Sequence, residues 1–267
     1  MPLSSSINEN ELRSLINEHI DGTVRDARTL TKYRRVLIGF ADALDPDFLR
    51  LRAFINQSHR LPTDILPEAR TVVSFFVPFS KEVVVANGRH PFVAEEWAIA
   101  YSETNRLIEE ICSSLAIRLE REGVKANWEL PTHNFDKESM TSYWSHKSVA
   151  KIAGLGSFGL NQMLITDSGC AGRFGSIITD ASVTPTPKSK IESCLHLVDK
   201  SCVACVERCP NHALTITGLD KHKCYQRCLE ADKAYSYLAE SRGLPRPFDA
   251  CGKCSIGPCS LKNPVKA

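Results

Sequence analysis

The chain has 267 residues, enough for one large domain or two unequal ones. Apolar residues make up 43% and charged residues 24%, which excludes a wholly disordered, collagen-like or coiled-coil chain. With 33 Lys and Arg against 31 Asp and Glu, the net charge of +2 gives no support for a protein that coats nucleic acid.

The first part of the chain, residues 1–185, predicts a mixed α/β (α+β) domain. Helical periodicity is expected over residues 8–20 and 47–57, with a short buried strand at 35–40 between them. Residues 71–77 are β-branched and aromatic and end at Pro78, so they form the clearest predicted strand.

The clearest helical region is residues 94–122, where apolar side chains recur on one face and Gly123 marks the end. Cys112 lies on that face and is expected in the core. A further helix is predicted at 145–153, ended by Gly154, and short strands at 163–166 and 176–179. No run of residues approaches the ~18 apolar positions of a membrane span, and the N-terminus does not resemble a signal peptide. We therefore expect a cytoplasmic protein with no membrane partner.

A linker is predicted at residues 184–187, two Thr-Pro steps that favour extended backbone. Beyond it there are few long apolar segments, and metal clusters would supply the stability that a small core does not. The expected domains are therefore residues 1–185 and 186–267.

Cysteine is the unusual component, because nine of the eleven cysteines fall between Cys194 and Cys259. In a cytosolic chain such density indicates metal, and the odd total fits poorly with complete disulfide pairing. Residues 202–210 form a C-x2-C-x3-C-P run, the second half of the bacterial ferredoxin pattern. Two intervening residues let both sulfurs face one cluster, and the proline sends the next cysteine the opposite way. Asp199 stands where one more cysteine is usual, and Cys194 is the expected replacement.

Two 4Fe–4S clusters need eight thiolates, and this region offers nine. Following the crossed ligation of two-cluster ferredoxins, we expect the first cluster to take Cys194, Cys202, Cys205 and Cys259. We expect the second to take Cys209, Cys224, Cys251 and Cys254. Cys228 is the spare, with the alternative that it replaces Cys224 or Cys194. Four-thiolate zinc sites, a single 4Fe–4S cluster and unligated structural thiols are the competing interpretations.

A glycine-rich segment follows the predicted helix at 145–153, and Gly154, Gly156 and Gly159 form G-x-G-x-x-G. The dinucleotide-binding fingerprint needs a strand before and a helix after, whereas here the order is reversed, so NAD is not expected. The glycines instead indicate close backbone approach to a large flat ligand, with tight turns that bind nothing as the alternative.

Four segments together resemble the epoxyqueuosine reductase family, whose members are cobalamin-dependent iron–sulfur proteins related to the reductive dehalogenases. They are AGLGSFGLNQMLI (153–165), GRFGSIITDA (172–181), ILPEARTVVSFFVPF (65–79) and the cysteine pattern. The resemblance covers residues 35–259. It implies a nitroreductase-like domain holding base-off cobalamin, followed by a ferredoxin-like module whose two clusters pass single electrons to cobalt. It also implies cobalamin contacts from Gly154, Leu155, Gly156, Ser157, Phe158, Gly159, Asn161, Gly175, Ser176 and Thr179.

Three departures from that family bear on the substrate. The Asp-Pro that supplies a proton donor in the tRNA-modifying members has no counterpart in residues 139–144, and Leu160 stands where they have Lys. The chain also ends eight residues after Cys259, without their helical-repeat tail. A tRNA substrate is therefore not expected, and the sequence resembles a short sister subfamily.

Acidic groups near the missing Asp are the candidates for protonating a reduced product. His133 and Asp136 are the expected catalytic residues, with solvated loop positions as the alternative; Glu138, Tyr143 and His146 are further candidates. Arg173 is expected to bind a cobalamin amide or an anionic substrate, or else only a surface carboxylate. Cys170 is interpreted as a small turn residue, with a position near the corrin as the alternative.

The expected function is that of an iron–sulfur and cobalamin-dependent oxidoreductase acting on a small organic substrate. An external ferredoxin- or flavodoxin-type protein would donate the electrons. One alternative is a corrinoid-handling protein that reduces cobalamin for a partner protein. Another is a plain electron carrier whose glycine segment binds nothing.

Overall fold

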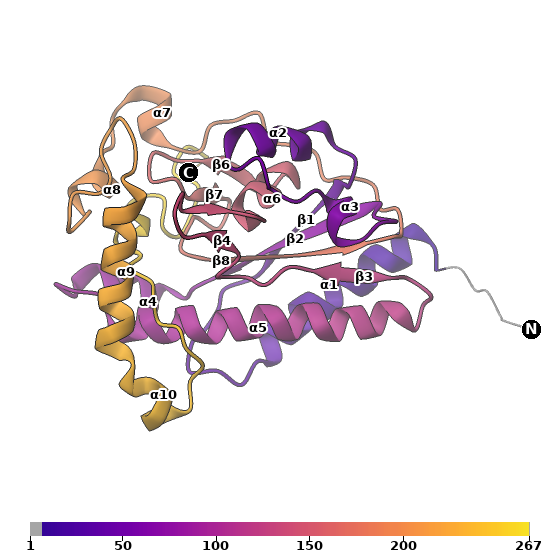
Figure 1. The fold of residues 1–267 in the computed structure, drawn as a ribbon, viewed down its shortest axis with the longest axis horizontal. Helices are drawn as coiled ribbons and strands as arrows, with labels where there is room; N and C mark the ends of the chain where they lie inside the picture. The colour runs from indigo at the N-terminus through magenta and orange to yellow at the C-terminus, as the bar shows by residue number, and fades with distance from the viewer. Residues whose placement is uncertain (1–6, 267) are drawn as a thin grey trace, which may run out of the picture.

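A four-stranded sheet forms the centre of the computed structural model, which describes residues 7–266 (Figure 1). The strand order is β1-β2-β8-β3, and every neighbouring pair is antiparallel. The strands are β1 (Leu37–Asp42), β2 (Thr71–Pro78), β8 (Gly172–Thr179) and β3 (Ala126–Trp128). All eight residues of β2 are buried, because this strand has a neighbour on each side and helices over both faces.

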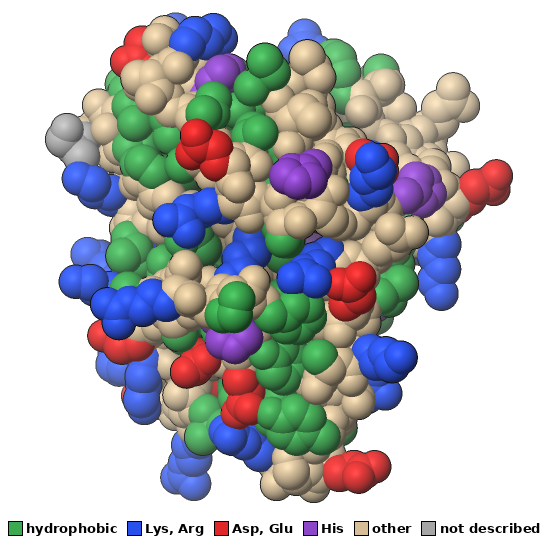
Figure 2. Space-filling model, turned by 90° about the vertical axis from the view of Figure 1, so that its left-hand side faces the viewer, with side chains coloured by type: hydrophobic (Ala, Val, Ile, Leu, Met, Phe, Trp, Pro, Cys, Tyr) green, Lys and Arg blue, Asp and Glu red, His purple; other side chains and the backbone are tan. Residues whose placement is uncertain are grey.

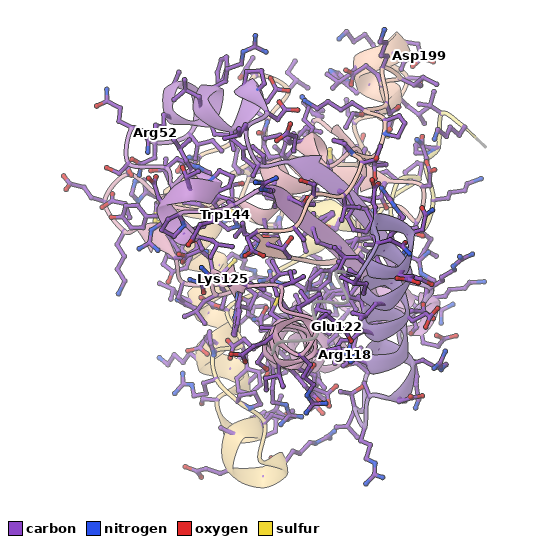
Figure 3. The ribbon with its side chains drawn as sticks, turned by 90° about the vertical axis from the view of Figure 1, so that its right-hand side faces the viewer. Arg52, Arg118, Glu122, Lys125, Trp144 and Asp199 are labelled. Carbon is purple, nitrogen blue, oxygen red and sulfur yellow. The ribbon has the colours of Figure 1, made fainter. Side chains whose placement is uncertain are left out.

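One face of the sheet is covered by α1 (Glu9–Asp26) and the long α5 (Glu95–Glu120) (Figure 1). Alternate residues of β2, such as Phe75, pack into this layer with Ile16 and Ile108. Cys112 is fully buried there, as its place on the apolar face of the predicted helix indicated. Figure 3 views α5 from its C-terminal end, where Arg118 and Glu122 form an ion pair of 2.7 Å.

The opposite face is covered by α2 (Pro46–Phe54), α3 (Pro62–Ile65) and α6 (His146–Ile152). Trp144 points into this layer and stacks on Phe48 (Figure 3). Two small hairpins lie beside α6, and the second contains the glycine-rich segment. They are β4 (Phe135–Asp136) with β5 (Thr141–Ser142), and β6 (Gly156–Phe158) with β7 (Leu164–Thr166).

The C-terminal part of the chain consists of short elements joined by loops. They are α7 (Leu195–Asp199), α8 (Ala204–Glu207), α9 (Lys221–Tyr235), α10 (Tyr237–Arg242) and the 3-10 turn η1 (Lys253–Ser255). This part packs on α4 (Lys81–Arg89) and the start of α5, where Tyr235, Leu238 and Phe248 share one apolar core with Trp97. The proposed boundary between residues 185 and 186 is thus crossed by a continuous core.

The expected helices and strands match the structure closely, and the coarse mixed helix-and-sheet class is confirmed. The helices α3, α4 and α7 to α10 and the strands β3 to β6 were not anticipated, and β8 begins four residues earlier than expected. In the described part of the chain, no helix is both long and apolar enough to cross a membrane. The Thr-Pro linker is extended and covers the outer edge of β1, where Thr186 N–H donates to Phe40 O at 2.8 Å.

Candidate functional site

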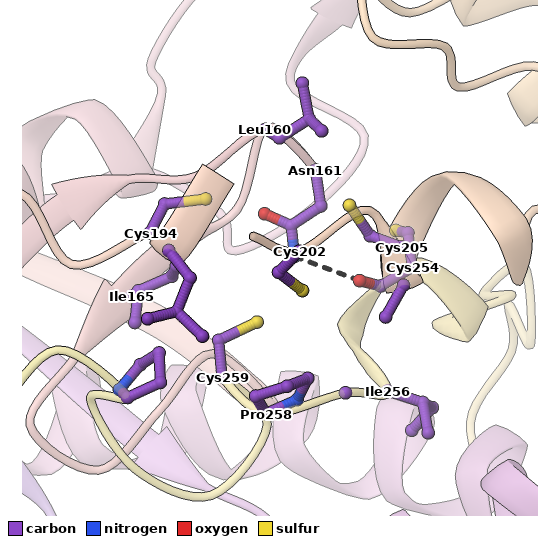
Figure 4. A pocket seen from close by; sticks show the side chains of 14 residues that line it. Leu160, Asn161, Ile165, Cys194, Cys202, Cys205, Cys254, Ile256, Pro258 and Cys259 are labelled. Atoms are coloured by element: carbon purple, nitrogen blue, oxygen red, sulfur yellow. Dashed lines mark hydrogen bonds between the residues drawn. The ribbon is translucent and has the colours of Figure 1, made fainter. Parts of the chain in front are cut away.

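Five cysteines line one pocket (Figure 4). Cys194 precedes α7, Cys202 lies just before α8 and Cys205 within it, and Cys254 and Cys259 come from the C-terminal loop. Four of them, Cys194, Cys202, Cys205 and Cys259, are those that the sequence assigns to a first cluster, whereas Cys254, assigned to the second, lines the same pocket. Much of the remaining wall is apolar, and it includes Leu160, Ile165, Ile256, Pro258 and Pro264.

A second group of cysteines lies next to the first. Cys209, Cys224 and Cys254 pack around the same small apolar cluster, and Cys251 lies close enough to Cys254 for their charges to interact. The Sγ of Cys209 accepts hydrogen bonds from the N–H groups of Ala213 at 3.2 Å and Leu214 at 3.3 Å. Two backbone amides therefore already point at this sulfur.

The ninth cysteine, Cys228, lies one turn beyond Cys224 on α9. A hydrogen bond between the two side chains lowers the pKa of Cys224 to about 7 and raises the pKa of Cys228. Cys224 is thus the better thiolate of the pair, and Cys228 the better donor.

The loop from Cys251 to Cys254 is fixed against the N-terminal part of the chain. Gly252 has φ +67°, and a Cβ there would lie 2.0 Å from the ring of Trp97. Lys253 is buried, and its ammonium donates to the carbonyls of Asn87 and His90 at the end of α4. Sequence reasoning missed Lys253, since a lysine between two cysteines gives no sign of burial.

Cys170 is more than the turn residue that the sequence suggested. It is fully buried, its Sγ lies 3.8 Å from the Sγ of Cys259, and its N–H donates to Cys259 O at 2.9 Å. The thiol hydrogen bond lowers the pKa of Cys259. Asn161, expected at cobalamin, instead donates to Cys254 O at 2.9 Å and lies 3.8 Å from Cys170 Sγ.

Burial disfavours ionisation of several thiols. It raises the pKa of Cys205 to about 11 and that of Cys254 to about 12. A bound cation would reverse this balance, because metal ligation deprotonates a thiol outright. Within residues 7–266, no group of three or more His, Cys, Asp or Glu side chains is placed to hold a single metal ion. The cysteines of the first group line a pocket and do not converge on the position of a single ion.

Two adjoining cavities lie on the other side of the β6–β7 hairpin. The larger, of about 970 Å³, lies between α2, α6, β6 and residues 188–192 of the linker. The smaller, of about 250 Å³, lies between residues 131–135, the start of α6 and β8. Both are lined by Ser142, Ser145 and Lys147. The larger cavity is at the upper end of the ~300–1,000 Å³ range of small-molecule clefts.

The residues expected to contact cobalamin divide into two sets. Gly156, Ser157 and Phe158 line the larger cavity, and Arg173 lines the smaller. The remaining residues make contacts within the protein: Gly154, Leu155, Gly159, Asn161, Gly175, Ser176 and Thr179.

His146 is held neutral in the wall of the smaller cavity. Ser176 accepts from Trp144 Nε1 at 2.9 Å and bonds His146 Nδ1 at 2.9 Å, while His146 Nε2 bonds Leu130 O at 3.0 Å. This network assigns the proton to Nε2, because a carbonyl only accepts. Burial lowers the pKa of His146 to about 4, which makes it a poor proton donor.

His133 faces the same cavity from a loop. Its Nε2 lies 3.4 Å from Oδ2 of Asp249, whose side chain is 5% exposed, and this contact raises the pKa of His133. His133 also has φ +60°, a left-handed conformation that costs energy in a non-glycine residue. Asp136 accepts from Ser139, which lowers its pKa, and it is not among the residues that line either cavity. Asp249, 113 residues beyond Asp136, gave no signal in the sequence.

The sequence matches no family model and no curated protein. Among solved structures, a selenomethionine-labelled epoxyqueuosine reductase aligns over 97% of this chain and 71% of its own, with a TM-score of 0.57 and 16% identity. The enzyme from Streptococcus thermophilus aligns over 96% of this chain and 67% of its own, with a TM-score of 0.58 and 18% identity. A reductive dehalogenase studied for B12-dependent dehalogenation aligns over 86% of this chain and 30% of its own, with a TM-score of 0.55 and 16% identity.

This chain has the fold of the epoxyqueuosine reductases. The reductive dehalogenases share it. The resemblance seen in the sequence is therefore confirmed at the level of the overall fold, whereas identities of 16–18% carry no residue role across. The chain spans about two thirds of the epoxyqueuosine reductases and about a third of the dehalogenase.

Replacing Gly156 by Ala should destabilise this epoxyqueuosine reductase-like fold by about 1–3 kcal/mol, the usual cost of overpacking. A Cβ there would lie 2.1 Å from the carbonyl oxygen of Ile165, across the β6–β7 hairpin. Denaturant unfolding measures the change. Gly22→Ala on α1 is the matched control, since its Cβ meets only Arg25 at 3.6 Å, and it should leave the protein as stable or more so. Equal losses in the two variants would contradict the close contact.

Acid should destabilise the protein through His146. Its pKa is 6.5 when exposed and about 4 when folded, so the unfolded chain binds more protons between these values. The free energy of unfolding therefore falls as pH drops through this window, by on the order of 3 kcal/mol at ~1.4 kcal/mol per pKa unit. As the pH drops through this range, the melting temperature should fall more steeply for the native protein than for His146→Gln. Above pH 6.5 the two curves of melting temperature against pH should run parallel. Parallel curves throughout would show that His146 does not carry the effect.

Proposed function

We propose that this protein is an iron–sulfur and cobalamin-dependent reductase of a small organic substrate. One observation carries the proposal: the β6–β7 hairpin forms part of the wall of the cysteine pocket and of both cavities. Leu160, Asn161 and Ile165 line the cysteine pocket, while Gly156–Phe158 line the larger cavity and Met163 the smaller. A redox cluster and an organic cofactor would thus lie within the thickness of one hairpin, a distance suited to electron transfer.

Two 4Fe–4S clusters account for the cysteines better than zinc does. The first group, Cys194, Cys202, Cys205 and Cys259, comes from three segments that meet at one pocket, and four thiolates are the ligand set of one 4Fe–4S cluster. The second would use Cys209, Cys224, Cys251 and Cys254, with Cys228 as a hydrogen-bond donor to Cys224. In this proposal residues 186–267 form the ferredoxin-like module. An external ferredoxin- or flavodoxin-type protein supplies its electrons.

The larger cavity is the proposed cobalamin site, in the nitroreductase-like part formed by residues 1–185. It has the volume for a macrocycle, and backbone of the glycine-rich segment lies at its wall. Ser193 N–H donates to Ser157 Oγ at 2.8 Å, which holds that wall against the linker. Bound cobalamin would supply a reduced, strongly nucleophilic cobalt.

The smaller cavity is the proposed substrate site, and His133 is its proton donor. Asp249 orients Nε2 and raises the pKa of His133, so that the imidazole is protonated at higher pH than a free histidine. A general acid works best when its pKa lies near the operating pH. Asp136 is the weaker candidate, because the hydrogen bonds from Ser139 favour its ionised form.

The surface favours a small substrate over a nucleic acid. One of the related structures was solved with an epoxyqueuosine-modified tRNA stem loop. On the face of this chain shown in Figure 2, Lys and Arg side chains are mixed with Asp and Glu. Mixed charge of this kind gives a weak counterion-release contribution to binding a polyanion.

Anaerobically prepared protein supplied with cobalamin should contain about eight irons, about eight sulfides and about one cobalt per chain. Cys259→Ala should lose about half of the iron, because it removes one ligand of one cluster, whereas Cys112→Ala should lose none. Elemental analysis and the visible spectrum measure this. Colourless protein, or protein loaded with zinc, would falsify the cluster proposal, and eight irons without cobalt would leave a plain electron carrier.

Cys224→Ala should remove one cluster, whereas Cys228→Ala should retain both and change the potential of one. The reason is that Cys228 donates a hydrogen bond to Cys224, and losing a donor to a ligand sulfur makes a cluster harder to reduce. Redox titration followed by electron paramagnetic resonance measures both effects. The assignment is reversed if Cys228→Ala loses iron while Cys224→Ala keeps it.

A further inference from the structure

The smaller cavity carries a guanidinium that the fold holds rigidly. Arg173 Nε donates to Asn105 Oδ1 at 3.1 Å, and Nη2 donates to Pro131 O at 3.2 Å. The guanidinium also lies over the ring of Tyr101, 4.4 Å from its centroid. Among the described residues, Nη1 of Arg173 has no hydrogen-bond partner, and neither has the buried Nδ2 of Asn105. Arg173, which lines the cavity, therefore keeps one nitrogen from which no group of the described residues accepts.

The residues that line that cavity include Arg173 and Lys147 but no carboxylate. The buried Asp249 is not among them and lies 3.4 Å from His133. The side-chain hydrogen bonds of Arg173 go to an amide and a carbonyl, not to an acid. An anion placed here would meet an uncompensated guanidinium in a half-buried setting, where charge interactions are stronger than in water.

Three aromatic side chains form part of the remaining wall. Phe135, Trp144 and Phe174 line the cavity, and the last two are almost fully buried. Phe174 is fixed by stacking on Phe76, with ring centroids 4.4 Å apart. Rigid aromatic walls of this kind favour a planar group. The volume of about 250 Å³ limits the occupant to a small molecule.

We infer that the smaller cavity binds a small planar carboxylate, with its carboxyl group on Arg173 and its planar part against the aromatic wall. A small planar carboxylate would be the substrate class of the proposed reductase. The reduction of that molecule rests on the proposed function, whereas its binding does not. A guanidinium and a carboxylate pair through two parallel hydrogen bonds, and the fixed orientation of Arg173 lowers the entropic cost of forming them.

Benzoate and its neutral isostere benzamide are suitable probes, because they differ at the anionic group alone. Calorimetric titration of cluster-loaded protein, with and without bound cobalamin, should show benzoate binding about tenfold to a hundredfold more tightly. Arg173→Gln should remove this preference. Arg173→Lys should keep part of it, because lysine retains the positive charge but lacks the two parallel N–H donors of the guanidinium. Arg118→Gln, at the far end of α5, is the control and should retain the full preference.

Equal affinity for the two probes, no binding of either, or a preference that survives in Arg173→Gln would each overturn the inference. If Arg173→Gln fails to fold, the comparison of the two probes on the native protein still decides. The cobalamin-free titration separates this inference from the proposed function. A protein that takes up no cobalt but prefers benzoate would refute the reductase and keep the carboxylate site.

Discussion

The docking of the C-terminal cysteine loop onto the β7–β8 turn is the contact on which the site depends. Cys170 N–H donates to Cys259 O at 2.9 Å, and Ala171 N–H donates to Ser260 O at 3.1 Å. Arg34 fixes the same junction from a third segment, with one nitrogen on Ser168 O at 2.7 Å and another on Leu261 O at 2.8 Å. These hydrogen bonds are all accepted by backbone carbonyls and are partly buried, so they hold the cysteine pocket at a constant distance from the cavities. Without them the cysteine pocket and the two cavities would not be held in a fixed arrangement.

This junction explains why the glycine-rich segment has its composition. The hairpin must be thin, because it has a cysteine pocket on one side and a large cavity on the other. Gly156 permits the close pairing with Ile165, and Asn161 turns its amide toward Cys254 O. The apolar Leu160 covers the cysteine pocket at the turn. One short segment therefore lines the cysteine pocket with its tip and the larger cavity with its first strand.

Local patterns in the sequence anticipated much of the fold and only part of the site. The helix around Cys112 and the strand β2 could be predicted because their periodicity and composition reflect burial directly. Four of the five cysteines that line the first pocket could be grouped because ferredoxin-type motifs constrain their spacing, whereas Cys254 was assigned to the other group. Contacts between segments that are far apart in the sequence produce no local pattern of this kind. Asp249 beside His133 and Lys253 under α4 depend on how the C-terminal part packs, and no spacing rule encodes that.

The same packing argues that metal binding and folding of the C-terminal part are coupled. Neither α7 nor α8 buries a single residue fully, and each is at most five residues long, so these helices have little stability of their own. Ligation of Cys194, Cys202, Cys205 and Cys259 would close this segment onto the C-terminal loop and supply the missing energy. Because that loop is bonded to the β7–β8 turn, the metal would also set the wall of the cavities. Assembly of the first cluster would then be a condition for a well-formed cofactor site.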